Sequence, residues 1–409
     1  MKRRFATLLT SLLLCTLATP AQDWTQWRGP NRDGAAGFAA PAKWPEKLTL
    51  VWKAPMASGY ATPVVLKDRA WVHGRDGEEE VVASFDLKTG KQLWTKRYAA
   101  AFTKNQYAVK MGKGPNSTPL LHNGRLYTLG TTAILSSFDA ATGALQWRKE
   151  LGAPNTSKMF CGTAASPLVE GGNLIIYAGD DINGGRMYAF DPATGAEKWK
   201  WTGDGPGYAS PIAVTLGGAR HIVTFTDKSV VGVDARDGTL LWKTPFPDEW
   251  NENIVTPIVY KDLLILSGVR KGTSAVRVAK QGGAWAVQEV WKNPDVRMYM
   301  SSPVLEGKYL YGMSERNKGQ YFCLDADTGK ALWLTTGREG ANASILNARD
   351  VLLILTADGS LIAARKNPQA FEQAAKYSVA DSSTYSHPVA VGNRILIRDE
   401  SSLALWSLN

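Results

Sequence analysis

Short hydrophobic runs alternate with turn-forming residues along most of the chain. Between residues 168 and 201, four short runs rich in β-forming residues are separated by clusters of Gly, Asn and Asp. Short runs of this kind, bounded by turn residues, are typical of strands joined by hairpins. The stretch therefore predicts four antiparallel strands, and the same pattern returns in the segments on either side of it.

One motif, Asp-x-x-Thr/Asp-Gly-x-x-x-Trp, marks the end of these four-strand units. The Asp side chain can cap a tight turn and the Gly can supply its positive φ, while the Trp on the following outer strand offers a large surface to a neighbouring unit. Five close copies occur, a weaker one keeps only its Trp, and a tryptophan near the N-terminus fits the same slot. The expected structural residues are Asp86, Gly90, Trp94, Asp139, Gly143, Trp147, Asp191, Gly195, Trp199, Asp234, Gly238, Trp242, Trp291, Asp325, Gly329, Trp333 and Trp52.

A second motif, Ser or Thr followed by Pro and apolar residues, opens each unit. It begins at Thr62-Pro63 and recurs, with two imperfect copies, at spacings of 56, 48, 44, 46, 46, 42 and 43 residues. Periods of about 40–50 residues with β patterning are typical of propeller blades. We therefore predict an all-β protein, an eight-bladed β-propeller of four-stranded antiparallel blades.

The last unit stops after three strands, from His387 to Asn409, and lacks a closing Trp strand. Residues 50–53 supply a strand of that type at the other end of the chain. We expect this N-terminal strand to complete the last blade and close the ring. The predicted organisation is a leader over 1–21, an N-terminal extension packing on the ring over 22–47, and a single propeller over 48–409.

These repeats resemble the PQQ-like β-propeller repeat family, which includes the outer-membrane assembly factor BamB and quinoprotein dehydrogenases. The residues that carry the resemblance are Asp86, Thr89, Gly90 and Trp94 with their counterparts, and it covers nearly all of the chain after the leader. The segment from Asp23 to Gly34 also looks like the opening of exported members. The resemblance implies the fold, but it leaves the activity open because the same fold carries both enzymes and scaffolds.

The first 21 residues have the pattern of an export signal. Lys2, Arg3 and Arg4 precede an apolar run over 8–17, and small residues lead to an expected cut after Ala21. The run is too short to cross a membrane. Lipid anchoring at Cys15 is not favoured because Leu14 is larger than the residue such sites carry. We therefore expect an exported protein, periplasmic or secreted, that does not span a membrane.

The net charge limits the expected binding partners, and the cysteine content limits the expected disulfides. The formal charge of +10 falls to +7 without the leader, and no run of five basic residues occurs, so nucleic-acid binding is not favoured. Without the leader the chain contains only two cysteines, Cys161 and Cys323, and this number excludes a disulfide framework. They are expected as two buried thiols, with a single long-range bridge as the alternative.

Catalytic motifs are sparse. The resemblance to quinoproteins implies, as one alternative, pyrroloquinoline quinone with calcium in the channel, but the adjacent cysteine pair of such enzymes does not occur. His73, His122, His221 and His387 lie in different repeats. Residues 179–185 resemble a calcium loop but lack its downstream glutamate, so a hairpin turn is expected. We expect no catalytic residue, no metal site and no cofactor.

The loops that enter the innermost strands should face one mouth of the channel. Positions three and four before the Pro slots bring several Tyr and Asn side chains to this rim, suited to stacking and hydrogen bonding. The alternative is that they only fill a narrow channel. The candidate binding residues are Tyr60, Asn116, Tyr208, Asn253, Tyr299, Asn342 and Tyr385.

Two further segments border the expected ring. The loop from Tyr98 to Gly114 is the longest insertion and is either a binding loop or a solvated excursion. Trp24, Trp27 and Arg28 either cover the ring or anchor the incoming chain. The sequence thus favours an exported, non-catalytic binding or assembly scaffold for an envelope protein or polysaccharide. A quinoprotein oxidoreductase and a glycan-binding propeller are the alternatives.

Overall fold

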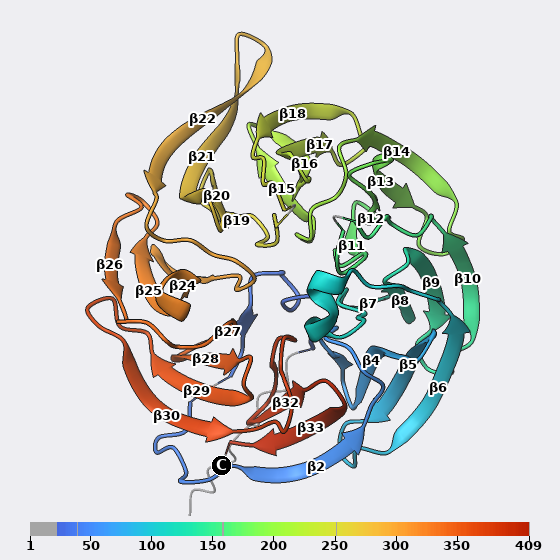
Figure 1. Ribbon diagram of the computed structural model, residues 1–409, viewed down its shortest axis with the longest axis vertical. Coiled ribbons are helices and arrows are strands. Elements are labelled where there is room, and N and C mark those ends of the chain that lie inside the picture. Colours follow the sequence, from blue (N-terminus) through green and yellow to red (C-terminus); the bar gives the residue numbers. More distant parts are fainter. Residues whose placement is uncertain (1–22, 39, 158, 251, 409) are drawn as a thin grey trace, which may run out of the picture.

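The computed structural model describes residues 23–408 apart from 39, 158 and 251. Eight antiparallel sheets stand around a central axis, as Figure 1 shows. This confirms the predicted all-β, eight-bladed propeller. The predicted leader over 1–21 lies outside the described residues. No helix in the described part of the chain is long and apolar enough to cross a membrane.

Blades 1 to 4 follow one another along the chain, each built from four strands with the innermost first. Blade 1 contains β3 (Val64–Leu66), β4 (Arg69–Asp76), β5 (Glu79–Asp86) and β6 (Gln92–Ala99), and blade 2 contains β7 (Leu120–His122), β8 (Arg125–Leu129), β9 (Ile134–Asp139) and β10 (Leu145–Glu150). Blade 3 contains β11 (Leu168–Glu170), β12 (Asn173–Asp180), β13 (Gly184–Phe190) and β14 (Glu197–Gly203), and blade 4 contains β15 (Ile212–Leu216), β16 (Ala219–Phe225), β17 (Ser229–Asp234) and β18 (Leu240–Pro245).

Blades 5 to 8 complete the circle. Blade 5 contains β19 (Ile258–Tyr260), β20 (Leu263–Gly268), β21 (Gly272–Gln281) and β22 (Ala284–Asn293), and blade 6 contains β23 (Val304–Glu306), β24 (Tyr309–Ser314), β25 (Gln320–Asp325) and β26 (Ala331–Leu334). Blade 7 contains β27 (Ala343–Ala348), β28 (Val351–Thr356), β29 (Ser360–Arg365) and β30 (Glu372–Ser378), with β1 (Ala35–Ala36) added in parallel to β27. Blade 8 contains β31 (Val389–Val391), β32 (Arg394–Arg398), β33 (Ser402–Ser407) and β2 (Thr49–Pro55). Two short 3-10 helices, η1 (Gln106–Met111) and η2 (Arg316–Lys318), lie in connections.

The ring closes between the two ends of the chain. Strand β2 pairs antiparallel with β33, so an early strand forms the outer edge of the last blade. The indole nitrogen of Trp52 then donates a hydrogen bond to the carbonyl of Leu87 in blade 1, at 2.9 Å. The predicted closure by an N-terminal strand is confirmed.

The Asp-Thr-Gly turns have the predicted chemistry. In blade 1, Oδ1 of Asp86 accepts from the backbone nitrogen of Thr89 at 2.8 Å and from its hydroxyl at 2.7 Å. Gly90 has a φ of 72°, in the left-handed region that glycine occupies without a steric penalty. Asp139 and Thr142 repeat the arrangement in blade 2.

Most of the motif tryptophans bind the blade that follows their own. The indole nitrogen of Trp94 donates to the carbonyl of Ala140, and that of Trp147 donates to the carbonyl of Pro192, both at 3.2 Å. Trp291 bonds Ala326 in the same way at 2.9 Å. The predicted packing across blade boundaries is therefore present.

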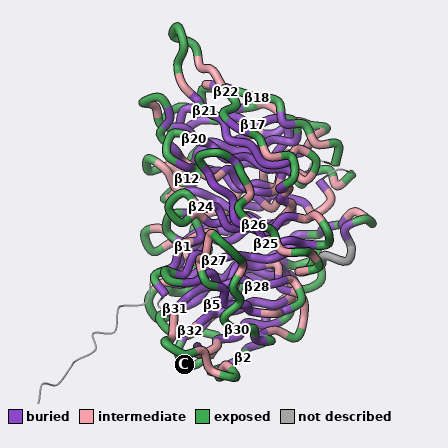
Figure 2. The backbone as a smooth tube through the Cα atoms, turned by 90° about the vertical axis from the view of Figure 1, so that its left-hand side faces the viewer, coloured by how far each residue is buried: buried purple, intermediate pink, exposed green. Residues whose placement is uncertain are grey.

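Trp242 is an exception because blade 5 has lost the Asp and Gly of the motif. Its indole nitrogen donates instead to Nδ1 of His221 in its own blade, at 3.1 Å. Trp285, in the long β21–β22 hairpin, packs edge-on against the same imidazole with ring centroids 4.6 Å apart. Figure 2 shows the exposed tip of this hairpin extending beyond the ring.

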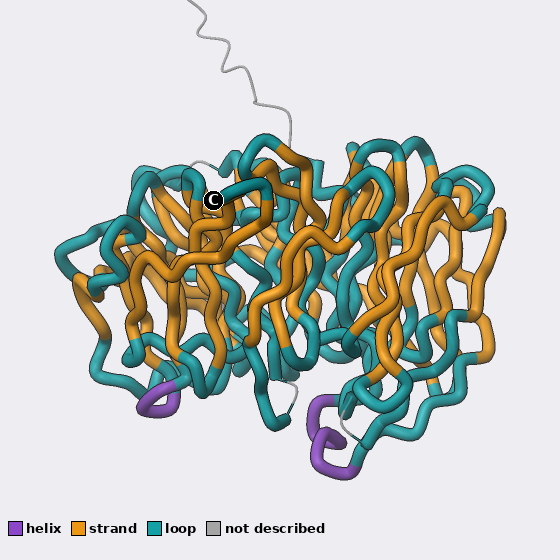
Figure 3. Tube along the Cα trace, turned by 90° about the horizontal axis from the view of Figure 1, so that it is seen from above, coloured by secondary structure: helices purple, strands orange, loops and turns teal. Residues whose placement is uncertain are grey.

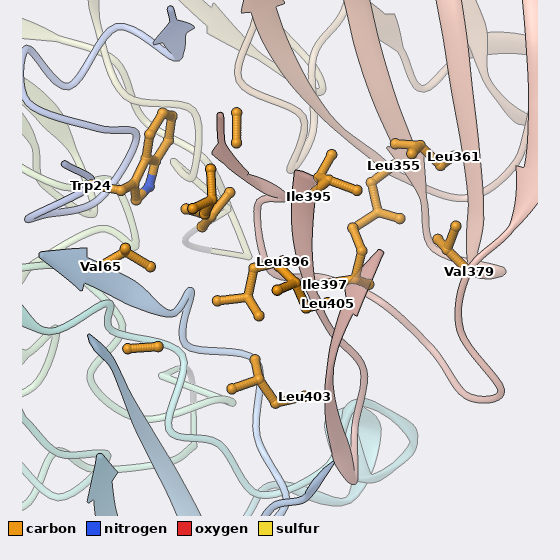
Figure 4. Packing of buried hydrophobic residues seen from close by; sticks show 14 of the residues in the cluster. Trp24, Val65, Leu355, Leu361, Val379, Ile395, Leu396, Ile397, Leu403 and Leu405 are labelled. Atoms are coloured by element: carbon orange, nitrogen blue, oxygen red, sulfur yellow. The ribbon is translucent and has the colours of Figure 1, made fainter. Parts of the chain in front are cut away.

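The largest hydrophobic cluster lies where the chain ends meet. It joins Trp24 and Val65 to leucines and isoleucines of blades 7 and 8, such as Leu355, Leu396 and Leu405. Figure 4 shows these side chains between strands from opposite ends of the sequence. In the outer-strand slot of blade 7, the hydroxyl of Tyr377 donates to the carbonyl of Pro45 at 2.8 Å. Cys161 and Cys323 are both free, as expected, but only Cys323 is buried, whereas Cys161 is half-buried.

Candidate binding cavity

A belt of hydroxyl groups from the Ser/Thr-Pro motif connects blade 8 and blades 1 to 5 around part of the channel. The backbone nitrogen of Thr118 donates to the hydroxyl of Ser166 at 2.9 Å, and Ser166 donates in turn to Ser210 at 2.9 Å. Thr62 donates to Thr118 at 3.3 Å, and the nitrogen of His387 donates to the hydroxyl of Thr62 at 3.0 Å. Each hydroxyl thereby satisfies a buried backbone donor of the neighbouring blade.

The N-terminal extension closes one end of the channel. The ring of Trp27 lines the floor of a central cavity, and the guanidinium carbons of Arg28 and Arg32 each lie 5.4 Å from its centroid. Arg32 donates to the carbonyl of Pro167 at 2.8 Å, and Arg28 donates to that of Pro303 at 2.5 Å. We call residues 24–34 the plug.

The plug is held by blades from several parts of the ring. Trp24 and Val65 exchange backbone hydrogen bonds at 2.7 and 2.8 Å, and the nitrogen of Leu121 donates to the carbonyl of Thr25. On the far side, the nitrogen of Asn347 donates to the carbonyl of Gly34 at 2.9 Å. The plug therefore anchors the incoming chain and also covers the channel. The two roles that the sequence suggested as alternatives are both present.

The cavity has a volume of about 630 Å³, and Tyr107 and Ala108 of η1 line it. Both 3-10 helices lie on the same face of the ring (Figure 3). Figure 1 shows η1 near the centre of the ring. The residue three positions before the Pro slot lines the cavity in every blade, as the repeat spacing predicts. These residues are Tyr60, Asn116, Ala164, Tyr208, Ile254, Met300, Asn342 and Tyr385.

The two candidate residues four positions before a Pro slot, Asn253 and Tyr299, differ in their location. Tyr299 lines the cavity. Asn253 does not, because its buried side-chain amide donates to the carbonyls of Thr226 at 2.9 Å and Phe246 at 3.0 Å. Asn253 therefore holds the neighbouring loops, and six of the seven candidate binding residues come together in the cavity.

Loops from three connections add lining residues that the motifs do not reveal. The long insertion contributes Tyr107, which is 77% exposed at the mouth. Phe160 and Cys161 come from the next connection, and Trp250 comes from the connection after blade 4. In the sequence, only the length of the insertion indicated Tyr107. Nothing in the repeat pattern indicated Phe160, Cys161 or Trp250.

A buried ionic network fixes the start of the long insertion. Glu80 accepts hydrogen bonds from Arg75 at 3.1 Å, from the hydroxyl of Tyr98 at 2.7 Å and from the nitrogen of Thr131 at 2.7 Å. Arg75 also donates to the carbonyl of Ala100 at 2.7 Å. The network therefore ties blade 1, blade 2 and the loop together.

The lining is almost uncharged. Glu252 is the only carboxyl side chain among its described residues, which include no Lys or Arg, and Oε1 of Glu252 accepts from the hydroxyl of Tyr299 at 2.8 Å. Burial, together with this hydrogen bond and the Glu252 charge, raises the pKa of Tyr299. Burial and the positive charge of Arg28 lower the pKa of His387 to about 3, so this imidazole is neutral.

The part of the chain that the structure describes contains no metal-binding cluster. No group of three or more His, Cys, Asp or Glu side chains there is placed to hold a metal ion. The Asp180 carboxylate is occupied by the backbone nitrogens of Ile182, Asn183 and Asn155, so the residues 179–185 form a capped turn.

Pyrroloquinoline quinone does not fit this lining. The quinone is a tricarboxylate, so its burial requires cations that balance its charge. A calcium ion bound with it would require several oxygen ligands. The described lining offers one carboxylate and no Lys or Arg. Arg28 and Arg32 lie behind Trp27 and donate to backbone carbonyls.

The sequence matches the model of a family described as outer membrane protein assembly factor BamB, over residues 78–318 and 313–407. The chain belongs to the BamB family of PQQ-like propellers. A BamB protein of Burkholderia pseudomallei is 24% identical over 350 residues, which cover 76% of this chain and 86% of that protein.

Solved structures show the same fold as this BamB-family chain. The crystal structure of BamB from Moraxella catarrhalis is 16% identical, has a TM-score of 0.62, and aligns over 88% of this chain and 99% of its own. The quinohemoprotein alcohol dehydrogenase of Comamonas testosteroni is 15% identical, with a TM-score of 0.65 and coverages of 96% and 81%. At these identities the likeness concerns the fold.

Proposed function

We propose that this protein is a non-catalytic binding scaffold of the cell envelope. The observation that supports this most directly is the cavity lining, which combines aromatic rings, amides and hydroxyls with a single hydrogen-bonded carboxylate. Such a lining can hold a ligand, and the described chain contains no cluster of side chains placed to hold a metal ion. The closed ring holds the site rigidly, as recognition requires.

Family membership supports an assembly role with a protein partner. The relatives include an outer membrane protein assembly factor that aligns with most of this chain. The mouth offers Tyr107 and Trp250, which are 77% and 48% exposed, as contact residues for a partner. The leader-like residues 1–21 support export, and N-terminal sequencing of the protein from a periplasmic fraction should give Gln22 as the first residue.

The test is a thermal-unfolding titration of the exported protein with pyrroloquinoline quinone and Ca²⁺. We expect no saturable rise in Tm, and no dye reduction with alcohols or aldehydes. A ligand at 100 times its Kd would add about 2.7 kcal/mol of stability. A saturable, Ca²⁺-dependent rise that Glu252→Gln abolishes would overturn the proposal in favour of a quinoprotein.

A photo-crosslinking residue at Tyr107 tests the scaffold role in the cell. We expect discrete adducts with envelope components from this mouth position. A matched probe at Lys376, exposed on the outer strand of blade 7, should not give the same adducts. Adducts confined to cytosolic proteins would contradict the proposed location and role.

A further inference from the structure

We propose that the cavity binds one end of a neutral, linear oligosaccharide. The inference rests on the proposed binding function and names the ligand class. The cavity of about 630 Å³ lies within the roughly 300–1,000 Å³ typical of small-molecule sites. Because the plug closes its floor at Trp27, it is blind, and a chain can enter it only by an end.

The walls suit the two faces of a pyranose ring. Aromatic rings offer flat apolar surfaces to the C–H groups of a sugar, and Tyr60 and Tyr385 form an edge-to-face pair with centroids 5.0 Å apart. Nearer the mouth, Tyr107 and Phe160 lie 6.2 Å apart. The amide of Asn116 provides a donor and an acceptor for hydroxyl groups. Oδ1 of Asn342 already accepts from the hydroxyl of Ser301 at 2.7 Å, so this amide offers its nitrogen as a donor.

The charge of the site selects a neutral ligand. Glu252 is bonded to Tyr299 and also lies 3.4 Å from Arg270, so its charge is already compensated. With His387 neutral, the floor offers no cation to an acidic sugar. A buried anionic ligand would therefore lose its hydration without gaining a partner.

The hydroxyl belt disfavours an extended peptide as the occupant. A peptide that adds to a sheet edge needs free backbone donors and acceptors. At the level of the belt, the backbone nitrogens of Thr62, Thr118, Ser166, Ser210 and His387 already donate to hydroxyls of adjacent blades. At these five positions the cavity therefore offers side chains in place of free backbone donors, and polar side chains match the hydroxyl-rich surface of a sugar.

Calorimetric titration of the full exported protein tests the proposal. The probes are linear gluco-, xylo- and manno-oligosaccharides of four to six units, and an oligogalacturonate of the same length. We expect saturable binding of at least one neutral oligosaccharide and at least tenfold weaker binding of the acidic one. The cyclic counterpart of the bound sugar, which has no chain end, should not bind.

Two variants connect the binding to the cavity. Trp250→Ala and Asn116→Ala should each weaken the binding about tenfold, which corresponds to about 1.4 kcal/mol. Tyr309→Ala, on β24 outside the lining, should leave the affinity unchanged. All three proteins should keep their far-UV circular dichroism, so a loss of binding cannot be assigned to unfolding.

The outcomes separate this inference from the scaffold proposal. Binding of no neutral oligosaccharide, equal binding of linear and cyclic forms, or an unchanged affinity in both cavity variants would overturn the inference. If the quinone titration is also negative, the scaffold proposal stands without it. A Ca²⁺-dependent response to the quinone would overturn both.

Discussion

Trp52 of blade 8 lies directly over Gly90 of blade 1, so close that a Cβ atom on Gly90 would be 2.6 Å from the indole ring. The two residues belong to the last and first blades and complete the circle of contacts. Gly143 meets Trp94 and Gly195 meets Trp147 in the same way. The glycine of the motif thus serves both its own turn and the tryptophan of the preceding blade.

We predict that Gly90→Ala destabilises the protein more than Gly124→Ala. Both glycines have similar positive φ values, 72° and 74°, so each substitution carries a left-handed backbone penalty of about 1–2 kcal/mol. Only the Cβ at position 90 meets the Trp52 ring, which adds about 1–3 kcal/mol of overpacking, whereas position 124 is open. Calorimetric Tm values check this, and equal losses would contradict the ring-closing contact.

Glu80→Gln should destabilise the protein by about 3–5 kcal/mol at pH 7, because it leaves the buried Arg75 without its anion. Burial raises the pKa of Glu80, but hydrogen bonds and charge from His73 and hydrogen bonds from Tyr98 and Thr131 outweigh it and hold the pKa at about 2.

The folded state therefore keeps this carboxylate ionised at a lower pH than the unfolded chain does. Its contribution, about 3 kcal/mol, is complete above pH 4.5 and is lost as the pH falls toward 2. Denaturant unfolding between pH 2 and 7 should show a flatter acid limb in Glu80→Gln. An unchanged acid limb would show that the network does not govern acid stability.

Asp227→Asn should have the opposite effect and stabilise the protein. Asp227 is 1% exposed, and in the described structure both of its side-chain oxygens lack a hydrogen-bond partner. Burial raises its pKa to about 6; the Lys228 ammonium, 3.7 Å away, opposes this rise, whereas the Asp204 charge adds to it.

The folded state thus binds this proton more tightly than the unfolded chain, and stability falls as the pH rises from about 4 to about 6. At pH 8 we expect Asp227→Asn to gain about 1–3 kcal/mol, with little gain at pH 4. Asp350→Asn, at an exposed turn, is the control and should change stability by less than about 0.5 kcal/mol. A loss at pH 8 would refute the expected strain of the buried charge.

Two truncations separate the plug from the closing strand. A chain that begins at Gly37 lacks the plug but keeps β2, so it should elute like the full exported protein and have a lower Tm, since the buried Trp24 is lost. A chain that begins at Met56 also lacks β2, so the mostly exposed edge strand of blade 8 is replaced by the buried, apolar β33. Uncovered edges promote aggregation, so gel filtration should show oligomers. Identical behaviour of the two would contradict the closing role of β2.

The repeat pattern by itself determined the fold and the location of one lining residue of the cavity in each blade. The Asp-Thr-Gly turn is a local device, since Asp86 caps Thr89 three residues away, and every copy therefore folds alike. Because the blades share one register, the position of Tyr60 relative to its Pro slot also holds for Asn342 and Tyr385. Because the repeats are periodic, residues at the same distance from the Pro slot lie at equivalent positions in each blade.

Only the tertiary structure decided what departs from the repeat. Asn253 turns to Thr226 and Phe246 through contacts between loops, which a spacing does not encode. The plug depends on Arg32 meeting Pro167 and Arg28 meeting Pro303, 135 and 275 residues along the chain. Such partners are set by how the closed ring brings distant segments together, because burial requires each guanidinium to find whichever carbonyl the assembled blades present.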